Sequence, residues 1–499
     1  MKTAKQIFEK IPEAKILSGG DVAVNMLVAD SRRVIPGALF FALDGMRCCG
    51  ADFVPDALSR GAVGVVARQQ LDLPPEVAQI VVPDVRKALA LAARAFFDDP
   101  AASLRLVGVT GTNGKTSVSS IVRFLMMSRK DAPWGLIGTV RYELGARSVP
   151  SYRTTPESLD LISFFSEMRD SGCEGAVMEV SSHAIDQDRI YGIPFNVVAF
   201  TNLTQDHMDY HHDMESYFAV KSRLFDGTQG FVPDVAVINS DDAHGVRLLE
   251  KLAPATQAVS FGTEDESKVS AATYLAKEIS LGAAGSEFLL ACPSGNFRVK
   301  TALPGHYNVS NVLCALAIVG SLGGDVGRAV ADLKNFCGVP GRMERVPDNP
   351  FPFDVFVDYA HTDDALSNAL SMLKKIAKGR LLVVFGCGGN RDRGKRPKMV
   401  RAVQRLADFA WATSDNPRKE PIEQIFDDMK AGISAPEKIA FEPNRRRAIS
   451  LAIDDAKPGD IVLIAGKGHE TYQEFADTTL PFDDKNVARE LLELRSCRA

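Results

Sequence analysis

The chain has 499 residues, which is too long for one hydrophobic core and predicts two to four domains. A hydrophobic fraction of 45% and a charged fraction of 24% are those of an ordinary globular protein. The formal charge of −5, without a long basic run, excludes a general attraction to nucleic acid, so any anionic ligand must be held by local groups.

Residues 1–103 are predicted to form a small α/β domain. Its short β-rich runs precede one helical stretch, and a polar, turn-prone segment follows: GALFFAL (37–43), GVVAR (64–68), DVRKALALAARAFF (84–97) and DDPAAS (98–103). The opening MKTAKQIFEK has no apolar stretch of signal-peptide length, and no 18 apolar residues run together anywhere. We therefore expect a cytoplasmic protein without membrane insertion.

Residues 104–338 alternate strand-like and helical runs, which predicts βαβ units and a mostly parallel sheet. The predicted strands are LRLVGVT (104–110), GAVMEVS (175–181), NVVAFTNL (196–203) and VAVINS (235–240). The predicted helices are SVSSIVRFLMM (117–127), MESYFAVKSRLF (214–225) and NVSNVLCALAIVGSL (308–322). An insertion at about 268–303 is predicted to form short antiparallel strands instead.

Residues 339–499 repeat this alternation and predict a second parallel sheet with helices. Its strands and helix starts are DVFVDYA (354–360), a helix from Asp363, RLLVVFGC (380–387), a helix from Pro397, FAWATSDN (409–416), another helix and DIVLIAGKG (460–468). The predicted class is thus α/β with three domains. The eight cysteines are scattered without a CxxC pair or metal-ligand spacing, so we expect small buried apolar residues in a reducing compartment.

The stretch VTGTNGKTS, residues 109–117, follows a predicted strand and precedes a predicted helix. It departs from the stricter phosphate-loop pattern, which would have glycine in place of Val109. Backbone N–H groups of the turn and the helix N-terminus converge on one point, which suits phosphate oxygens. Lys115 would reach the β- and γ-phosphates of ATP, and the Thr116 hydroxyl would bind Mg²⁺. The alternative is a Gly-Asn turn that only joins strand and helix.

The loop sequence GTNGKT resembles that of the Mur ligases of peptidoglycan synthesis, relatives of folylpolyglutamate synthetase, and the resemblance covers essentially the whole chain. It implies an ATP-dependent ligase that joins an amino group to a carboxylate. It also implies a UDP-sugar-binding domain in 1–103, a P-loop-type ATP-binding domain in 104–338 and a Rossmann-like amino-acid-binding domain in 339–499. ATP contacts are implied for Gly111, Thr112, Asn113, Gly114, Lys115 and Thr116.

The resemblance implies three further residues at Mg²⁺. Glu179 in MEVSSHAIDQDRI lies at the predicted carboxyl end of a strand, where α/β sheets bind ligands. His207 in LTQDHMDYHH is implied to act on a second Mg²⁺, although histidine is not a favoured ligand of this ion and a polar surface loop is the alternative. Lys221 in YFAVKSRLF is implied to carry a CO₂-derived carbamate; otherwise it is a lysine on an amphipathic helix, which usually faces solvent.

Contacts with nucleotides are implied in all three segments. Asn308 in GHYNVSNVLCA is implied to lie near the adenine and Arg342 in GVPGRMERV to bind the ATP phosphates. Asp358 in VDYAHTDDAL is implied to bind the ribose, with His361 beside it. Ordinary cap or turn residues are the alternative. Ser31 in ADSRRVIPGALFFAL is implied to face the uridine diphosphate, but CCGADF replaces the family's usual glycine-histidine pair downstream.

The remaining candidate residues are implied to hold the two substrates that are joined. The anionic UDP-N-acetylmuramoyl-dipeptide would be positioned by Thr154, Thr155, Ser181, Gln187 and Arg189. The amino acid would be held by Arg391, Asp415, Asn416, Arg418, Gly466 and Glu470. The sequence DNPR at 415–418 resembles that of the members that add meso-diaminopimelate, and a guanidinium can bind the extra carboxylate of this amino acid bidentately. Locally, Asn-Pro is also a common turn.

The resemblance therefore implies a ligase that activates the D-glutamate γ-carboxylate of the UDP-dipeptide as an acyl phosphate and joins it to meso-diaminopimelate. Lys115, Arg342 and two Mg²⁺ ions would neutralise charge, and no protein nucleophile is needed. We expect a monomer with these small molecules as its only partners. The alternatives are ligation of L-lysine, a folylpolyglutamate-type ligase, and a nucleotide switch that hydrolyses ATP without an acceptor.

Overall fold

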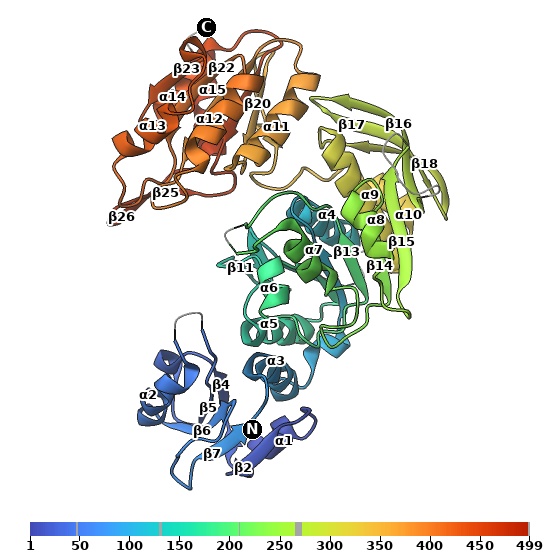
Figure 1. Ribbon diagram of the computed structural model, residues 1–499. Helices are drawn as coiled ribbons and strands as arrows, with labels where there is room; N and C mark the ends of the chain where they lie inside the picture. Colours follow the sequence, from blue (N-terminus) through green and yellow to red (C-terminus); the bar gives the residue numbers. More distant parts are fainter. Residues whose placement is uncertain (46–47, 129–131, 209, 265–271, 498–499) are drawn as a thin grey trace. The chain divides into compact units, whose positions relative to one another are not determined.

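The computed structural model describes residues 1–45, 48–128, 132–208, 210–264 and 272–497 (Figure 1). Its internal contacts divide the chain into two compact units. Unit 1 comprises Met1–Tyr274 and Cys314–Val326, and unit 2 comprises Leu275–Leu313 and Gly327–Ala499. No helix within the described ranges is long and apolar enough to cross a membrane.

The beginning of unit 1 forms a five-stranded sheet in the order β2-β7-β6-β5-β4. Its strands are parallel except at the pair of β2 with β7. The strands of this region are β1 (Lys2–Thr3), β2 (Lys15–Ser18), β3 (Ala23–Val24), β4 (Met26–Val28), β5 (Ala38–Phe41), β6 (Ala62–Ala67) and β7 (Ala78–Val81); the helices are α1 (Ala4–Phe8), α2 (Val54–Ser59) and α3 (Val85–Phe96). Asp84 caps α3 by accepting hydrogen bonds from the N–H groups of Arg86 and Lys87, as its position predicts.

The part of the second sheet that lies in unit 1 runs β11-β10-β9-β12-β8-β13-β14-β15 and is parallel from β9 to β15. Its strands are β8 (Arg105–Thr110), β9 (Trp134–Ile137), β10 (Arg141–Glu143), β11 (Ser148–Pro150), β12 (Gly175–Glu179), β13 (Val197–Phe200), β14 (Val235–Asn239) and β15 (Gln257–Thr263). The helices of this region are α4 (Lys115–Met127), α5 (Ser158–Asp170), α6 (Ser182–Asp186), α7 (Met214–Ser222) and α8 (Ala243–Leu249). The predicted mostly parallel sheet is confirmed.

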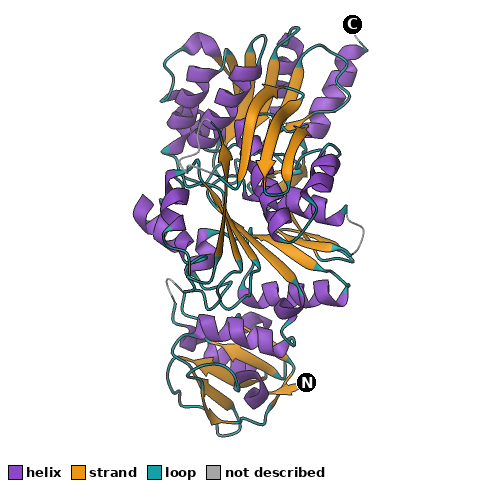
Figure 2. Cartoon of the chain, turned by 90° about the vertical axis from the view of Figure 1, so that its right-hand side faces the viewer, coloured by secondary structure: helices purple, strands orange, loops and turns teal. Residues whose placement is uncertain are grey.

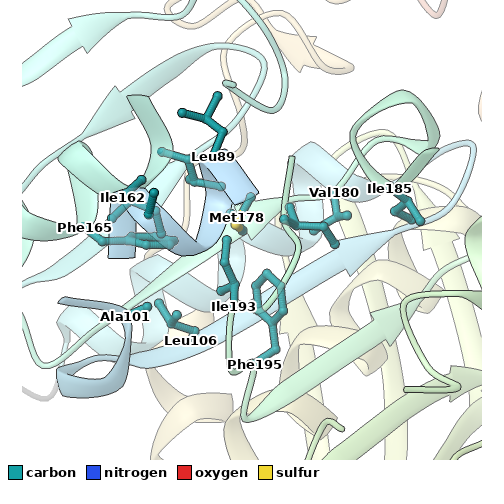
Figure 3. Close-up of a cluster of buried hydrophobic side chains, with 14 of the residues drawn as sticks. Leu89, Ala101, Leu106, Ile162, Phe165, Met178, Val180, Ile185, Ile193 and Phe195 are labelled. Carbon is teal, nitrogen blue, oxygen red and sulfur yellow. The ribbon is translucent and has the colours of Figure 1, made fainter. Parts of the chain in front are cut away.

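Buried apolar side chains of this sheet and of α3 belong to one core. Leu106 of β8 and Met178 of β12 are almost fully buried, as are Leu89 of α3 and Phe165 of α5 (Figure 3). The strands read as continuous apolar runs because helices cover both faces of a parallel sheet. This core holds the carboxyl ends of β8 and β12 in a fixed register, with Glu179 opposite Val109.

Unit 2 contains antiparallel pairs of β16 (Tyr274–Gly282), β17 (Gly285–Cys292) and β18 (Gly295–Thr301). They confirm the antiparallel insertion predicted for 268–303, of which 268–271 lie outside the described residues. Helix α9 (His306–Ser321) follows, with residues 306–313 in unit 2 and 314–321 in unit 1, and α10 (Val326–Leu333) belongs to unit 2 from Gly327 onward.

The main sheet of unit 2 runs β19-β20-β24-β21-β22-β23 and is parallel except for β19. Its strands are β19 (Glu344–Arg345), β20 (Asp354–Asp358), β21 (Leu381–Cys387), β22 (Phe409–Ser414), β23 (Ile439–Glu442) and β24 (Ile461–Ala465). The helices are α11 (Asp363–Ile376), α12 (Lys395–Leu406), α13 (Ile422–Lys430), α14 (Arg445–Asp455) and α15 (Asp484–Ser496), and a hairpin joins β25 (Tyr472–Phe475) to β26 (Thr478–Pro481). Helix α12 begins at Lys395, two residues before its predicted start at Pro397.

Helices cover both faces of this sheet (Figure 2). Val383 of β21 packs in the cluster with α11, α12 and α13, whereas its neighbour Val384 packs in the cluster with α14 and α15. The alternation follows from the pleat of a strand, which points successive side chains to opposite faces. The predicted doubly covered parallel sheet is confirmed.

The cysteines correct one prediction. Cys173, Cys314 and Cys387 are buried, but Cys48, Cys49, Cys337 and Cys497 are exposed. Those four lie in loops or after the last helix turn, where composition alone could not place them.

Candidate active site

The loop at residues 109–117, called the phosphate-like loop because it resembles a phosphate-binding loop, has the geometry that its sequence predicts. Strand β8 ends at Thr110, and α4 begins at Lys115 after a turn that needs two glycines. Gly111 has φ +142°, and a Cβ there would lie 1.9 Å from the Thr201 hydroxyl. Gly114 has φ +87° and gives α4 no side-chain cap, so the first N–H groups of this helix can bind an anion. Lys115 Nζ donates to the carbonyls of Gly111 and Thr112, both at 2.9 Å.

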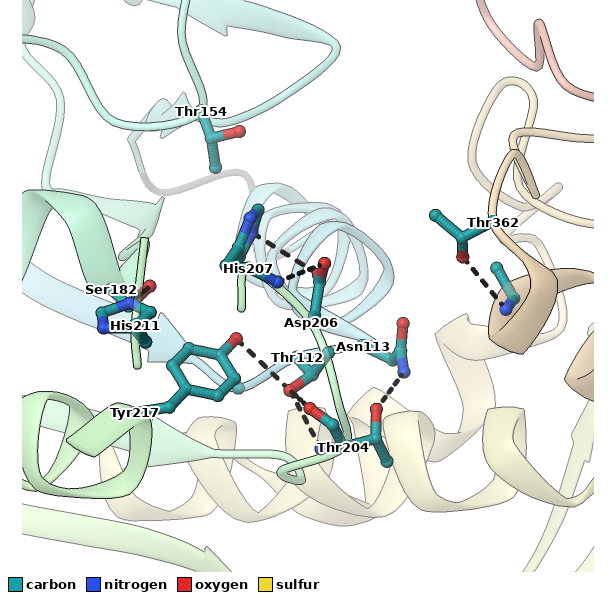
Figure 4. Close-up of polar contacts among 12 residues, drawn as sticks. Thr112, Asn113, Thr154, Ser182, Thr204, Asp206, His207, His211, Tyr217 and Thr362 are labelled. Atoms are coloured by element: carbon teal, nitrogen blue, oxygen red, sulfur yellow. Dashed lines mark hydrogen bonds and ion pairs between the residues drawn. The ribbon is translucent and has the colours of Figure 1, made fainter. Parts of the chain in front are cut away.

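The loop is joined to the segment 201–204, which follows β13. The N–H of Thr112 donates to the Asn202 carbonyl at 2.9 Å, and the Thr112 hydroxyl accepts from the N–H of Thr204 at 3.0 Å. The side chain of Asn113 donates to the Thr204 hydroxyl at 3.2 Å (Figure 4). These bonds fix the turn without using the side chain of Lys115.

Glu179 lies at the carboxyl end of β12, as predicted, and is 1% exposed. Its Oε2 accepts from the Thr116 hydroxyl at 3.0 Å and from the Thr139 hydroxyl at 3.0 Å, while its Oε1 accepts from the N–H of Thr139 at 2.8 Å. A Cβ at Gly138 would lie 2.4 Å from Oε1, so any larger residue there would displace this carboxylate oxygen. Sequence reasoning missed Thr139, although Gly-Thr directly after β9 places it at the same sheet edge.

Lys221 is buried in α7, with an exposed fraction of 1%, which corrects the interpretation as a solvent-facing lysine. Its Nζ donates to the Gly111 carbonyl at 3.0 Å and lies 4.7 Å from the centre of the Tyr217 ring. Burial, and then the positive charge of Lys115, hold the pKa of Lys221 well below its usual range. The structure therefore brings Lys221 to the phosphate-like loop.

His207 lies in the loop after β13 with φ +54° and contacts Asp206, which sequence reasoning missed. Its N–H donates to Asp206 Oδ1 at 2.8 Å, and its Nε2 lies 3.4 Å from Oδ2 (Figure 4). Within the described part of the chain, no group of three His, Cys, Asp or Glu side chains could hold a metal ion. Next to the loop, the oxygen atoms of the Glu179 carboxylate and the Thr116 hydroxyl lie 3.0 Å apart.

The five residues predicted to hold the UDP-dipeptide form one network beside Glu179. The Thr155 hydroxyl donates to the Glu179 carbonyl at 2.8 Å, and the N–H of Ser181 donates to this hydroxyl at 3.1 Å. Arg189 donates to the Thr155 carbonyl at 2.9 Å and to the side chain of Gln187. The network also contains a contact of 3.1 Å between the hydroxyls of Thr154 and Thr139.

Ser31, the predicted uridine contact, lies elsewhere in unit 1. It begins the 3₁₀ turn η1 (Ser31–Arg33) after β4 and is 6% exposed. A hydrogen bond from Ser31 lowers the pKa of Asp56, which thereby joins η1 to α2.

The parallel strands of the main sheet of unit 2 end at one edge, and the residues predicted to hold the amino-acid acceptor follow three of them, β21, β22 and β24. Asn416 after β22 donates from Nδ2 to Glu470 Oε2 at 2.9 Å. A Cβ at Gly466, after β24, would lie 2.5 Å from Asp415 Oδ2. The structure thus brings Asp415, Asn416, Gly466 and Glu470 together.

Arg418 already has a carboxylate partner, which the sequence did not predict. Its Nε lies 2.9 Å from Glu474 Oε2 in β25, and its Nη1 donates to the Gly389 carbonyl at 3.0 Å. Its Nη2 makes no hydrogen bond to the residues that the structure describes. Arg391, in the neighbouring loop after β21, is exposed.

Three residues of unit 2 are predicted to contact ATP, and they lie in different segments of the chain: Asn308, Arg342 and Asp358. Both carboxylate oxygens of Asp358, at the end of β20, accept backbone N–H groups, from Met343 at 2.6 Å and Ala360 at 2.9 Å. The guanidinium of Arg342 lies 4.9 Å from the centre of the Tyr359 ring, and its Nε is buried without a partner among the described atoms. Asn308, in the first turn of α9, is buried and donates to the Pro304 carbonyl at 2.8 Å.

A fully buried ion pair supports the acceptor edge. Arg445 donates to both oxygens of Asp484 at 2.7 and 2.6 Å, and neither side chain is exposed. The guanidinium also donates to the carbonyls of Ser414, at 3.4 Å, and Ala465, at 3.0 Å. These carbonyls end β22 and β24, so the pair holds the two strands from which the acceptor loops depart.

Breaking this pair should destabilise the protein strongly. Arg445→Met leaves Asp484 buried without its partner, which costs about 3–5 kcal/mol, whereas Arg445→Met with Asp484→Leu should regain most of that loss because no buried charge remains. Thermal unfolding of the three proteins by calorimetry gives the comparison. A double variant as unstable as the single variant would contradict this explanation.

Models of three domains match the chain in order. A model described as "Mur ligase family, catalytic domain" matches residues 23–97, "Mur ligase middle domain" matches 109–319, and "Mur ligase, glutamate ligase domain" matches 341–468. The chain belongs to the Mur ligase family. It is accordingly an ATP-dependent ligase with the three-domain α/β architecture of Mur ligases.

Full-length relatives agree with this assignment. A protein of Geobacillus thermodenitrificans named UDP-N-acetylmuramoyl-L-alanyl-D-glutamate–2,6-diaminopimelate ligase is 43% identical, over 98% of this chain and 99% of its own. A protein of the same name from Solibacter usitatus is 43% identical, over 97% and 96%. A solved structure of a ligase of this name is 34% identical, covers 99% of both chains and has a TM-score of 0.72.

These matches confirm the predicted family, fold class and type of enzyme. The domain boundaries near residues 103 and 338, and the roles of individual Mur ligase residues, stay predictions.

Proposed function

We propose that this Mur ligase joins meso-diaminopimelate to the D-glutamate γ-carboxylate of UDP-N-acetylmuramoyl-L-alanyl-D-glutamate, as ATP is converted to ADP and phosphate. The observation that carries the proposal is the loop Asp415–Arg418, which lies at the carboxyl end of β22 in a chain 43% identical to ligases named for diaminopimelate. We further propose domains 1–103, 104–338 and 339–499 for the UDP-sugar, ATP and amino acid.

The reaction needs two transfers. A γ-carboxylate oxygen attacks the γ-phosphorus of ATP and ADP leaves; the amine then attacks the acyl carbon, and phosphate leaves as the amine loses a proton. Binding, orientation and charge neutralisation supply the catalysis of phosphoryl transfer. Lys115 and the N-terminus of α4 would hold the phosphates, together with Gly111–Thr116 and Arg342, whose buried Nε has an unused proton among the described contacts. The dipeptide would be oriented by Thr154, Thr155, Ser181, Gln187 and Arg189, and its uridine diphosphate bound near Ser31.

The residues beside the loop fit a hard cation. The Thr116 hydroxyl and the Glu179 carboxylate are 3.0 Å apart and are oxygen ligands of the kind that Mg²⁺ prefers. Bound Mg²⁺ neutralises charge on the phosphates. We also propose His207 for a second Mg²⁺, for which Asp206 holds the imidazole.

Lys221 is proposed to act as a carbamate. A neutral amine is needed to react with CO₂, and burial of Lys221 with its lowered pKa favours that form. Its Nζ already lies at the loop carbonyl of Gly111, so carbamate oxygens there would add to the ligands of Thr116 and Glu179.

Asn308 is proposed for the adenine and Asp358 for the ribose. Each oxygen of Asp358 has a lone pair beyond its backbone bond, so it can still accept a ribose hydroxyl. Six residues are proposed for the amino acid: Arg391, Asp415, Asn416, Arg418, Gly466 and Glu470. The cytoplasm, where ATP is made, is the proposed location, and a monomer the proposed state.

The acceptor assay tests the proposed function directly. With ATP, Mg²⁺ and the UDP-dipeptide, kcat/KM should favour meso-diaminopimelate over L-lysine by up to about 10⁴-fold, because a site built for a polar group rejects an analogue that lacks it. Arg418→Ala should reduce the ratio of kcat/KM for meso-diaminopimelate to kcat/KM for L-lysine, mainly by loss of activity on diaminopimelate. Since Glu474 already pairs with Arg418, the substrate carboxylate would engage Nη2.

Arg446→Ala is the matched control, because Arg446 forms an exposed ion pair with Glu490 on the helices of the same domain. The Arg446→Ala enzyme should keep the wild-type preference for meso-diaminopimelate over L-lysine. A wild-type enzyme with equal or higher kcat/KM for L-lysine would overturn the acceptor while leaving the ligase activity intact, and phosphate release without any acceptor would indicate the nucleotide switch.

A further inference from the structure

Lys467, between the acceptor residues Gly466 and Glu470, is the most buried amine of unit 2 that no proposed role uses. Its side chain is 0% exposed. Its Nζ donates to Asn416 Oδ1 at 3.0 Å and to Glu470 Oε2 at 3.0 Å, and lies 5.5 Å from the centre of the Tyr472 ring. A buried cation is costly unless it is paired and hydrogen-bonded, so this arrangement demands both partners.

The lysine determines which way the Asn416 amide points. Asn416 Oδ1 accepts from Lys467 Nζ and from the N–H of Glu474 at 3.1 Å. An ammonium and a backbone N–H can only donate, so the amide oxygen must face them and the NH₂ group must face the other way. One proton of that NH₂ is donated to Glu470 Oε2 at 2.9 Å.

The result is a closed triangle of hydrogen bonds with two open positions. Among the described residues, no other acceptor takes the second proton of Asn416 Nδ2, and no donor reaches Glu470 Oε1. The free Nδ2 proton of Asn416 can donate to a ligand, and the free oxygen of Glu470 beside it carries negative charge. A zwitterionic amino-acid centre offers the complement, since its carboxylate accepts and its ammonium donates.

We propose that Lys467 is a positioning residue of the acceptor site, which orients the Asn416 amide and the Glu470 carboxylate to bind one zwitterionic centre of the amino-acid substrate. The inference rests on the proposed function, because it assigns Asn416 and Glu470 to the acceptor. Two of the three N–H donors of Lys467 are directed to Asn416 and Glu470, and its Nζ lies near the Tyr472 ring, so its role is to position these side chains and not to bind the substrate itself.

The test is the steady-state kinetics of the full-length Lys467→Met enzyme with meso-diaminopimelate as the varied substrate. KM for diaminopimelate should rise about 10- to 100-fold, because the substitution removes the two charge-assisted hydrogen bonds that orient the Asn416 amide and the Glu470 carboxylate. KM for ATP and for the UDP-dipeptide should stay within about twofold, since no residue proposed to bind those ligands belongs to the triangle. A residue needed only for folding would not separate the three constants.

Two further variants sharpen the test. Lys374→Met is the control, because it removes a partly exposed lysine paired with Asp408 at 2.6 Å in the same domain and should change no KM. Lys467→Met combined with Glu470→Gln should be only as impaired as the worse single variant, since the lysine acts through that carboxylate. If Lys467→Met does not fold, Lys467→Gln, whose NH₂ group can still donate hydrogen bonds, is measured in the same way.

The outcomes separate this inference from the proposed function. A wild-type enzyme that does not use diaminopimelate overturns the proposed function. A wild-type enzyme that does use it, with KM for diaminopimelate unchanged in the folded Lys467 variant or raised equally with the other two constants, overturns the role of Lys467 alone.

Discussion

Lys115→Ala should lower kcat of the ligase at least about 10²-fold, with the affinity for the UDP-dipeptide nearly unchanged. Lys115 Nζ is held by two loop carbonyls at 2.9 Å, so its charge is fixed beside the N–H groups that begin α4. Charge placed before the reaction begins stabilises a phosphoryl-transfer transition state most, and its loss is felt in kcat. The predicted uridine contact, Ser31, lies in η1, which follows β4 of a different sheet of unit 1, and should not respond.

The measurement is the rate of ADP formation with both substrates saturating, together with equilibrium binding of the UDP-dipeptide. Lys251→Ala serves as control because this exposed lysine follows α8 and lies over the Phe218 ring. Near-normal turnover of Lys115→Ala would refute the phosphate role of the loop. An equal loss of dipeptide binding would show instead that the substitution disturbs the whole unit.

Lys221→Ala should be nearly inactive, and short-chain carboxylic acids should partly restore its activity. The substitution removes the buried Nζ at 3.0 Å from the Gly111 carbonyl and leaves space beside Thr110 and Gly111 of the loop. If a carbamate is the working form, what the variant lacks is a pair of oxygens, and a small carboxylate can supply them. Restored activity should increase with acid concentration and saturate, because it requires binding in a cavity.

Two comparisons decide this prediction. The same acids should not restore Lys115→Ala, which lacks a cation and not an anion. Mass spectrometry of the native enzyme at high bicarbonate gives an independent measure, since a carbamate adds the mass of CO₂ at Lys221. An active Lys221→Ala enzyme without additives would remove the carbamate from the proposed mechanism.

The sheet edges could be predicted from the sequence because strand ends follow from apolar runs. Glu179, Asp358, Asp415 and Gly466 each come directly after such a run, and each lies at the carboxyl end of a parallel strand. The turn at Gly111 could also be predicted from the sequence, since a strand, glycines and a helix occur there in order. Local patterns are sufficient where function depends on where a strand stops.

Burial and partner choice could not be predicted in the same way. The helix of Lys221 is predicted to be amphipathic, which would turn the lysine to solvent, and only the packing of α7 against the loop shows that its amine is buried. Glu474 reaches Arg418 from a hairpin that no pattern indicates, and nothing in the sequence shows that Lys467, between Gly466 and Gly468, is buried. Such contacts join residues far apart in sequence, which periodicity does not record.

The bonds between the phosphate-like loop and the segment 201–204 also constrain the motions of unit 1. The hydroxyl of Thr112 and the backbone of Thr204, 92 positions apart in the chain, share hydrogen bonds, and Gly111 leaves no space between the two backbones. Neither segment can open to solvent unless the other releases it, so they behave as one cooperative element in local unfolding. A nucleotide that orders the loop would thereby also restrain the stretch leading to His207.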